Sequence, residues 1–135
     1  MSNDFGILLK ARLGDGFIKS IEESGNAYIY VKHSSILMCM SALQSDTSLG
    51  FSTLVDCFAV KNFPEEKNVG ISIYYQLVSY VSGRRLFIIS DIAGEARAQS
   101  LSIIFWNADW FEREIFETFG TLFDGHPNMK PIFSE

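Results

Sequence analysis

The 135-residue chain contains 47% hydrophobic and 14% aromatic residues, with a formal net charge of -5 and a pI near 5.0. This length and composition predict a single domain, residues 1–135, with ample material for one hydrophobic core. The acidic balance argues against binding to nucleic acid or to anionic lipid, because both need positive surface charge.

The cysteines and histidines do not indicate a metal or redox site. Cys39 and Cys57 lie in apolar segments without the close spacing of a metal knuckle or redox pair. We therefore expect reduced, buried thiols. The two histidines are far apart in sequence, so a histidine-dependent metal site would need ligands from distant segments. No cofactor and no metal are expected in this chain.

The sequence also lacks the pattern of a membrane anchor. No run approaches the roughly 18 uninterrupted apolar residues of a membrane span. Residues 1–16 have no basic region ahead of their hydrophobic residues, as a secretory signal would. We expect a soluble, unexported chain that reaches a membrane only through its partners.

Hydrophobic periodicity and turn residues predict alternating helices and strands along the chain. The expected helices are 5–12, 36–43 and 110–119, and the expected strands are 27–32, 53–60, 70–81, 84–92 and 101–105. The Ser82-Gly83 turn predicts an antiparallel hairpin. Because most strands follow one another, the predicted class is α+β, with a central mixed, mainly antiparallel sheet packed by helices.

The strand 53–60 is apolar on both faces, which predicts a central place in the sheet. Asp56 then lies in an apolar row. It either pairs with Arg84 or Arg85 of the hairpin or binds a nearby backbone group.

The segment Asn107–Pro127 combines aromatic residues, charges and helix boundaries more densely than the rest of the chain. Asp109 and Glu112 have the spacing of a capping box, and Gly120 stands at the expected helix end. An apolar arc of this helix is expected to face the core: Phe111, Ile115, Phe116 and Phe119. Trp110 lies outside the arc. Because this aromatic side chain is not needed for the core side, the helix is expected to have a second contact surface. The alternative is a simple core helix.

The charged residues of this helix sharpen that expectation. Arg113 and Glu117 share its polar side at i, i+4 and can pair. Around the helix axis, the position of Glu114 falls between those of Trp110 and Phe111. Its carboxylate therefore either extends into water or meets a cation from elsewhere.

Each histidine has a simple local interpretation. His33 precedes the second helix, where Ser34 or Ser35 is the natural N-cap, and is expected in a surface loop. His126 belongs to the turn at residues 124–127 and is expected to be an exposed loop imidazole.

The run EREIFETFGTLFDGHP resembles the signature of the C-subunit family of proton-pumping NADH:quinone oxidoreductase, respiratory complex I. The positions that carry the resemblance are Trp110, Phe111, Glu112, Arg113, Glu114, Glu117, Phe119, Gly120, Phe123, Gly125, His126 and Pro127. Residues 54–60 and 73–88 resemble the family's central strands, so the likeness spans most of residues 30–133, with its signature in 107–133. The family usually continues with a hydrophobic residue and two arginines. Here Met129, Lys130 and Pro131 follow, which retains one cation.

This resemblance implies a non-catalytic subunit of the peripheral arm of complex I. In that family, FMN and iron–sulfur clusters belong to partner subunits, and electrons pass from NADH to quinone coupled to proton translocation. The implied partners are other peripheral-arm subunits, especially the D-subunit homologue, which helps form the quinone site. The implied location is peripheral, on the cytoplasmic face of a bacterial inner membrane or the matrix side in mitochondria. The expected partner-interface residues are Trp110, Arg113, Glu114, Glu117, His126 and Lys130.

Two alternatives remain open. Related membrane-bound hydrogenases and ferredoxin- or deazaflavin-linked complexes use the same fold. A hypothesis of a different class is a small hydrolase or lyase with Asp56, Glu112 and Glu114 as acid and base. It requires two carboxylates that converge in a cleft with separated pKa values.

Overall fold

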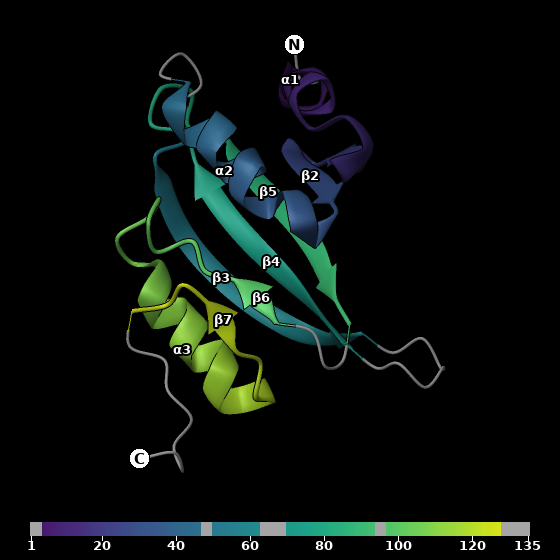
Figure 1. The fold of residues 1–135 in the computed structure, drawn as a ribbon. Helices are drawn as coiled ribbons and strands as arrows, with labels where there is room; N and C mark the ends of the chain where they lie inside the picture. Colours follow the sequence, from purple (N-terminus) through teal and green to yellow (C-terminus); the bar gives the residue numbers. More distant parts are fainter. Residues whose placement is uncertain (1–3, 47–49, 63–69, 94–96, 128–135) are drawn as a thin grey trace.

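A five-stranded sheet with three helices forms the domain (Figure 1). The computed structural model describes residues 4–46, 50–62, 70–93 and 97–127. The elements in chain order are α1 (Asp4–Leu13), the 3₁₀ turn η1 (Gly14–Gly16), β1 (Phe17–Glu23), β2 (Asn26–Val31), η2 (His33–Ser35), α2 (Ile36–Ser45), β3 (Thr53–Asn62), β4 (Gly70–Val78), β5 (Arg85–Ile92), β6 (Ala98–Gln99), α3 (Ala108–Phe119) and β7 (Phe123–Asp124).

The strand order in the main sheet is β1-β2-β5-β4-β3. The pairing of β2 with β5 is parallel, and the other pairings are antiparallel. The short strands β6 and β7 form a separate parallel pair. The predicted α+β class and the predicted β4–β5 hairpin are therefore confirmed.

One face of the sheet is the inner wall of the core. On β4, Ile73, Tyr75 and Leu77 are buried and alternate with half-buried residues of the opposite face. Figure 1 shows α2 lying across the sheet and α3 lying beside β3. The opposite face carries aromatic rings that stack across strands, such as Phe58 on Tyr74 with centroids 5.2 Å apart.

Among the longer strands, the structure differs from the prediction in two places: one observed strand was not predicted, and one predicted strand is not formed. Strand β1 has no counterpart in the prediction, because most of its side chains are polar or exposed and give no hydrophobic periodicity. Residues 101–105 form turns instead of a strand. The N–H groups of Ile104 and Phe105 both donate to the Leu101 carbonyl at 2.9 Å, a turn pattern that places Leu101 and Phe105 together in the core.

The predicted central position of the strand at 53–60 is also wrong, because β3 is an edge of the sheet. Its inner face is covered by α3, and its outer face is shielded in part by the Phe58–Tyr74 stack. Both faces therefore carry apolar residues although, among the described strands, β3 pairs only with β4. Asp56 Oδ1 accepts the Cys57 N–H at 2.8 Å, which is the backbone alternative, while Arg84 pairs with Glu22 at 3.5 Å.

Both cysteines are free and buried, as predicted. Burial raises the pKa of Cys39 to about 12. The pKa of Cys57 is also raised, first by burial and then by the nearby Glu112 and Asp56 carboxylates. Neither thiol is poised to act as a nucleophile near neutral pH.

Glu112 does not form the predicted capping box. The helix begins two residues earlier than expected, at Ala108, with Asn107 at the N-cap and no side-chain capping bond. Glu112 is instead 1% exposed and accepts two hydrogen bonds at 2.7 Å, from the Ser100 hydroxyl and the Leu101 N–H. Burial raises its pKa, and these two bonds oppose the rise.

We expect Glu112→Ala to lower the free energy of unfolding by about 2–4 kcal/mol, because the Ser100 hydroxyl and the Leu101 N–H lose their buried acceptor. Glu112→Gln should cost less, since its amide oxygen still accepts the Leu101 N–H. Urea denaturation measures both. The control is Glu114→Ala, an exposed glutamate of the same helix, with an expected change within about 0.5 kcal/mol. An alanine variant at 112 as stable as this control would contradict the structural role.

Candidate docking face on α3

The most exposed large hydrophobic side chains of the described residues lie just before α3. Ile103 is 84% exposed and Trp106 is 87% exposed, and Trp110 in the first turn of α3 is 66% exposed. Leu101 and Phe105 anchor the intervening turns in the core, which leaves Ile103 and Trp106 facing outward. Exposed apolar groups this close together in the chain are typical of protein contact sites.

Charged residues of α3 share the side of the helix that carries Trp110. Trp110, Arg113, Glu114 and Glu117 follow the spacing i, i+3, i+4 and i+7, so they share one side of the helix. Arg113 Nη1 lies 3.8 Å from Glu117 Oε2, as predicted. Glu114 is exposed and extends into water, which is one of its two predicted alternatives. We call Ile103, Trp106, Trp110, Arg113, Glu114 and Glu117 the α3 face.

The buried side of α3 agrees with the predicted arc at three of its four positions, and Phe116 is half-buried without belonging to the core cluster. Ile115 is buried, and Phe111 and Phe119 pack against the core, while Trp110 lies outside. Gly120 ends the helix with a φ of 77°, the left-handed conformation that glycine adopts at low cost. The helix therefore has both a core side and a free side.

His126 is a half-buried link and not an exposed loop imidazole. Its Nε2 donates to the Asp109 carbonyl at 3.0 Å, so the turn after β7 is bonded to the first turn of α3. Lys130 lies outside the described residues. Thus four of the six expected interface residues share one side of α3, His126 borders its first turn, and the role of all six in partner binding stays a prediction.

Ile103 and Trp106 were not among the residues expected at the partner interface. A strand at 101–105 would place Ile103 on the same side as Leu101 and Phe105, in the core. The spacing of Leu101 and Phe105, four residues apart, is the helical or turn signal that was available in the sequence.

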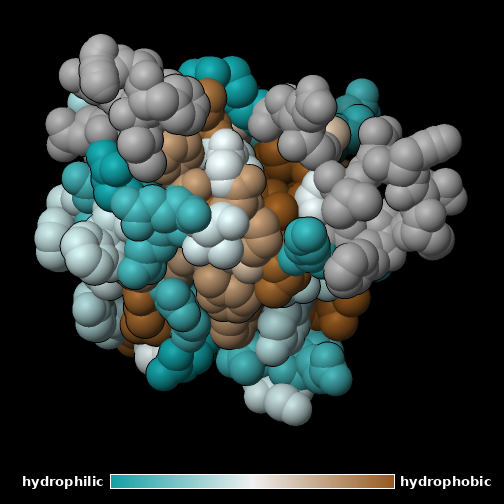
Figure 2. Space-filling model, turned by 90° about the horizontal axis from the view of Figure 1, so that it is seen from below, coloured by the Kyte–Doolittle hydropathy of each residue, from teal (hydrophilic) through white to brown (hydrophobic). Residues whose placement is uncertain are grey.

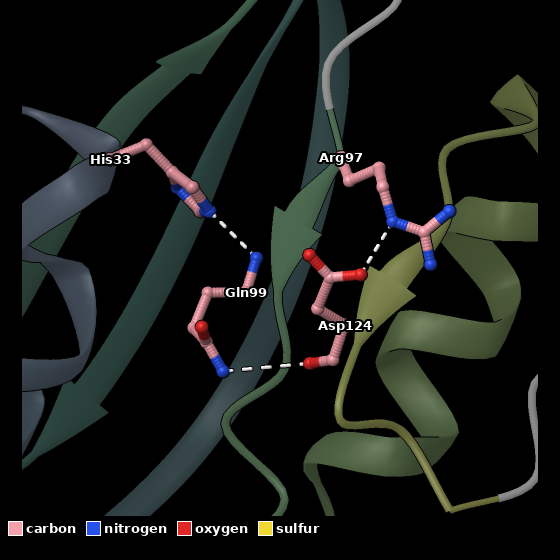
Figure 3. Close-up of polar contacts among 4 residues, drawn as sticks. All are labelled: His33, Arg97, Gln99 and Asp124. Carbon is pink, nitrogen blue, oxygen red and sulfur yellow. Dashed lines mark hydrogen bonds and ion pairs between the residues drawn. The ribbon is translucent and has the colours of Figure 1, made fainter.

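His33 is also not the predicted surface loop histidine (Figure 3). Its Nε2 accepts the Gln99 N–H at 2.9 Å, so the neutral ring carries its proton on Nδ1, which lies 2.9 Å from Ser90 Oγ. Arg97 and Asp124 form an ion pair that holds β6 to β7 in the same cluster. Burial lowers the pKa of His33 to about 4.

The carboxylates proposed for a hydrolase or lyase lie in three different settings. Glu112 faces the core, Glu114 faces solvent on the same helix, and Asp56 binds the backbone of β3. The described residues hold no group of three or more His, Cys, Asp or Glu placed to bind a metal ion. Among the described helices, none has the length and apolar character to cross a membrane.

The fold and the α3 face together define a small α+β domain with an exposed aromatic and charged surface suited to protein contact. The family model for the respiratory-chain NADH dehydrogenase 30 Kd subunit matches residues 29–135, and the chain belongs to this family.

Similar proteins agree with this assignment. The C-subunit of NADH-quinone oxidoreductase from Ruegeria pomeroyi is 30% identical over 132 residues, which cover 98% of this chain and 65% of that protein. NADH-ubiquinone oxidoreductase subunit 9 of Reclinomonas americana is also 30% identical, over 98% of this chain and 64% of that protein. The chain thus spans just under two thirds of the length of these relatives.

Two solved structures share the fold. A trypsin-resistant fragment of Nqo5 superposes with a TM-score of 0.74 at 21% identity, over 96% of this chain and all of that one. A chain of an archaeal membrane-bound sulfane sulfur reductase superposes with a TM-score of 0.79 at 17% identity, over 97% of this chain and 75% of that one.

We expect the half-buried His33 to make the fold acid-sensitive. The folded pKa of about 4 lies below the ordinary value of 6.5, so its contribution is complete above pH 6.5 and is lost as pH falls toward 4, because the unfolded chain takes up the proton first. The loss is at most about 3 kcal/mol. Urea unfolding at neutral and acidic pH measures how much the free energy of unfolding falls on acidification. That decrease should be smaller in His33→Gln than in the parent. In the control His126→Gln, which retains His33, the decrease should be as large as in the parent. Equal losses in the parent and His33→Gln would contradict this assignment.

Proposed function

We propose that this chain is a non-catalytic peripheral-arm subunit of an NADH:quinone oxidoreductase, where it supports assembly next to the quinone-site subunit. In this proposal, partner subunits carry FMN and the iron–sulfur centres that pass electrons from NADH to quinone, coupled to proton translocation. The family match over residues 29–135 is the observation that carries the proposal.

The polar chemistry of the domain is in keeping with a structural role. Glu112, His33 and Asp56 each accept a backbone N–H of this chain: Glu112 from Leu101, His33 from Gln99 and Asp56 from Cys57. These intramolecular hydrogen bonds give each polar group a structural role. The peripheral location at the cytoplasmic face of a bacterial inner membrane, or the mitochondrial matrix side, follows from the same proposal.

The partner we propose for the α3 face is the quinone-site subunit, the D-subunit homologue. Trp106 and Trp110 are large, rigid apolar groups of the kind that dominate binding energy when a pocket covers them. Glu114 and Glu117 outnumber Arg113 beside them, so the complementary surface is an apolar recess bordered by lysine or arginine.

A subunit of a hydrogenase-like or ferredoxin-linked complex is the remaining alternative. The likeness to the archaeal sulfur reductase chain supports it at the level of the fold. The NADH-quinone oxidoreductase assignment is favoured because it also rests on relatives 30% identical in sequence.

We expect Trp106→Ala and Trp110→Ala each to weaken binding of the quinone-site subunit by about 10- to 100-fold, the range for truncated hot-spot aromatics. Their melting temperatures should stay near that of the parent, because both side chains are exposed. Calorimetric titration of the purified pair measures the affinity. Ile18→Ala, on β1 at the far edge of the sheet, is the matched control and should bind like the parent. Parent-like affinity of both tryptophan variants would rule out the α3 face as the docking surface.

A further inference from the structure

The outer edge of β3 is open in the described part of the chain. The strand spans Thr53–Asn62 and pairs there only with β4. An edge strand presents unpaired N–H and C=O groups that can pair with a strand of another chain. Which part of β3 is accessible, and what it would accept, depends on its neighbours.

Hydrogen bonds identify the outward-facing residues. The Cys57 N–H is bound by Asp56 Oδ1 and so points away from β4. Because backbone groups leave a strand on alternating sides, the N–H and C=O of Ala59 also face the open edge, while those of Phe58 face β4. The Leu54 carbonyl accepts from Asn107 Nδ2 at 2.9 Å, so the start of α3 already occupies the edge there. The stretch beyond this contact begins at Cys57, which is itself only 4% exposed, with its N–H bound by the Asp56 carboxylate.

A groove of about 430 Å³ runs beside this stretch. Its β3 wall consists of Cys57, Phe58 and Ala59. Neighbouring side chains of a strand point to opposite faces, so a hollow that touches all three residues lies along the strand edge. Ile115 and Phe119 of α3 line the other wall. The underside of the molecule shows hydrophobic surface between hydrophilic residues (Figure 2).

The rim of the groove is acidic. Glu114 and Glu117 of α3 both line it. Glu117 forms an ion pair with Arg113, but no cation of the described residues pairs with the exposed Glu114. A segment that carries lysine or arginine would supply the missing partner.

We propose that the Cys57–Ala59 edge binds an extended, basic segment of a partner protein as an additional strand. The segment exchanges backbone hydrogen bonds with Cys57 and Ala59 and displaces the Asp56 carboxylate from the Cys57 N–H. It places an apolar side chain against Ile115 and Phe119 and a lysine or arginine beside Glu114. This mode uses the β3 backbone and is separate from contact through the tryptophans of the α3 face.

The test is NMR-detected amide exchange of the full chain with a capped peptide of about eight residues, near the usual strand length, that alternates valine with lysine and threonine. We expect the peptide to slow exchange of the Cys57 and Ala59 amides. The Phe58 and Val60 amides should change little, because they already face β4. The same peptide with N-methylated backbone at alternate positions should not bind, since it lacks the required donors.

Matched variants test the charge. Glu114→Gln should weaken peptide binding by about two- to fivefold, the range for an exposed charge pair. Glu23→Gln, an exposed glutamate on β1 at the opposite edge, should leave binding unchanged. Equal binding of a peptide with glutamate in place of lysine would overturn the proposal, as would shifts at Phe58 and Tyr74 without protection of the edge amides. Protection of Cys57 and Ala59 without peptide, together with a dimeric mass, would instead identify a second copy of the chain as the occupant and would also overturn it.

Discussion

The arrangement of the α3 region depends on one buried carboxylate. Glu112 accepts the Ser100 hydroxyl and the Leu101 N–H at the point where the chain leaves β6 and turns toward α3. Burying a charge is costly unless hydrogen bonds compensate, and the raised pKa of Glu112 reflects that cost. These two hydrogen bonds fix the turn so that Leu101 and Phe105 lie in the core while Ile103 and Trp106 lie on the surface.

The signature motif combines structure and surface in adjacent residues. Successive residues of a helix are about 100° apart, so Glu112 points to the core while Arg113 and Glu114 point outward. The histidine of the same motif, His126, bonds the following turn to the start of α3. The neutral ring of His33 similarly links β6 to β5, because it contacts the Ser90 hydroxyl and accepts the Gln99 N–H. Polar links thus hold the α3 region to the sheet in addition to apolar packing.

The sequence predicted features that depend on local pattern, such as the β4–β5 hairpin, the apolar arc of α3 and its end at Gly120. It failed where tertiary contacts decide. Glu112 has capping-box spacing from Asp109, yet it also lies on the same side of the helix as Ala108 and Ile115, and the Leu101 N–H selects the second role. Likewise, the apolar faces of β3 arise from α3 on one side and the Phe58–Tyr74 stack on the other, and local pattern cannot distinguish this edge strand from a central one.

The two proposed contact surfaces share two glutamates of α3, Glu114 and Glu117. Glu117 pairs with Arg113, whereas Glu114 follows Trp110 by one helical turn and also lines the groove beside β3. A single carboxylate gains most from one closely placed cation, because a second cation beside the first adds repulsion between the two. The tryptophans and the β3 backbone have no such conflict, since one surface uses exposed rings and the other uses strand hydrogen bonds. Competition between two partners would therefore centre on the glutamates that both surfaces share, Glu114 and Glu117.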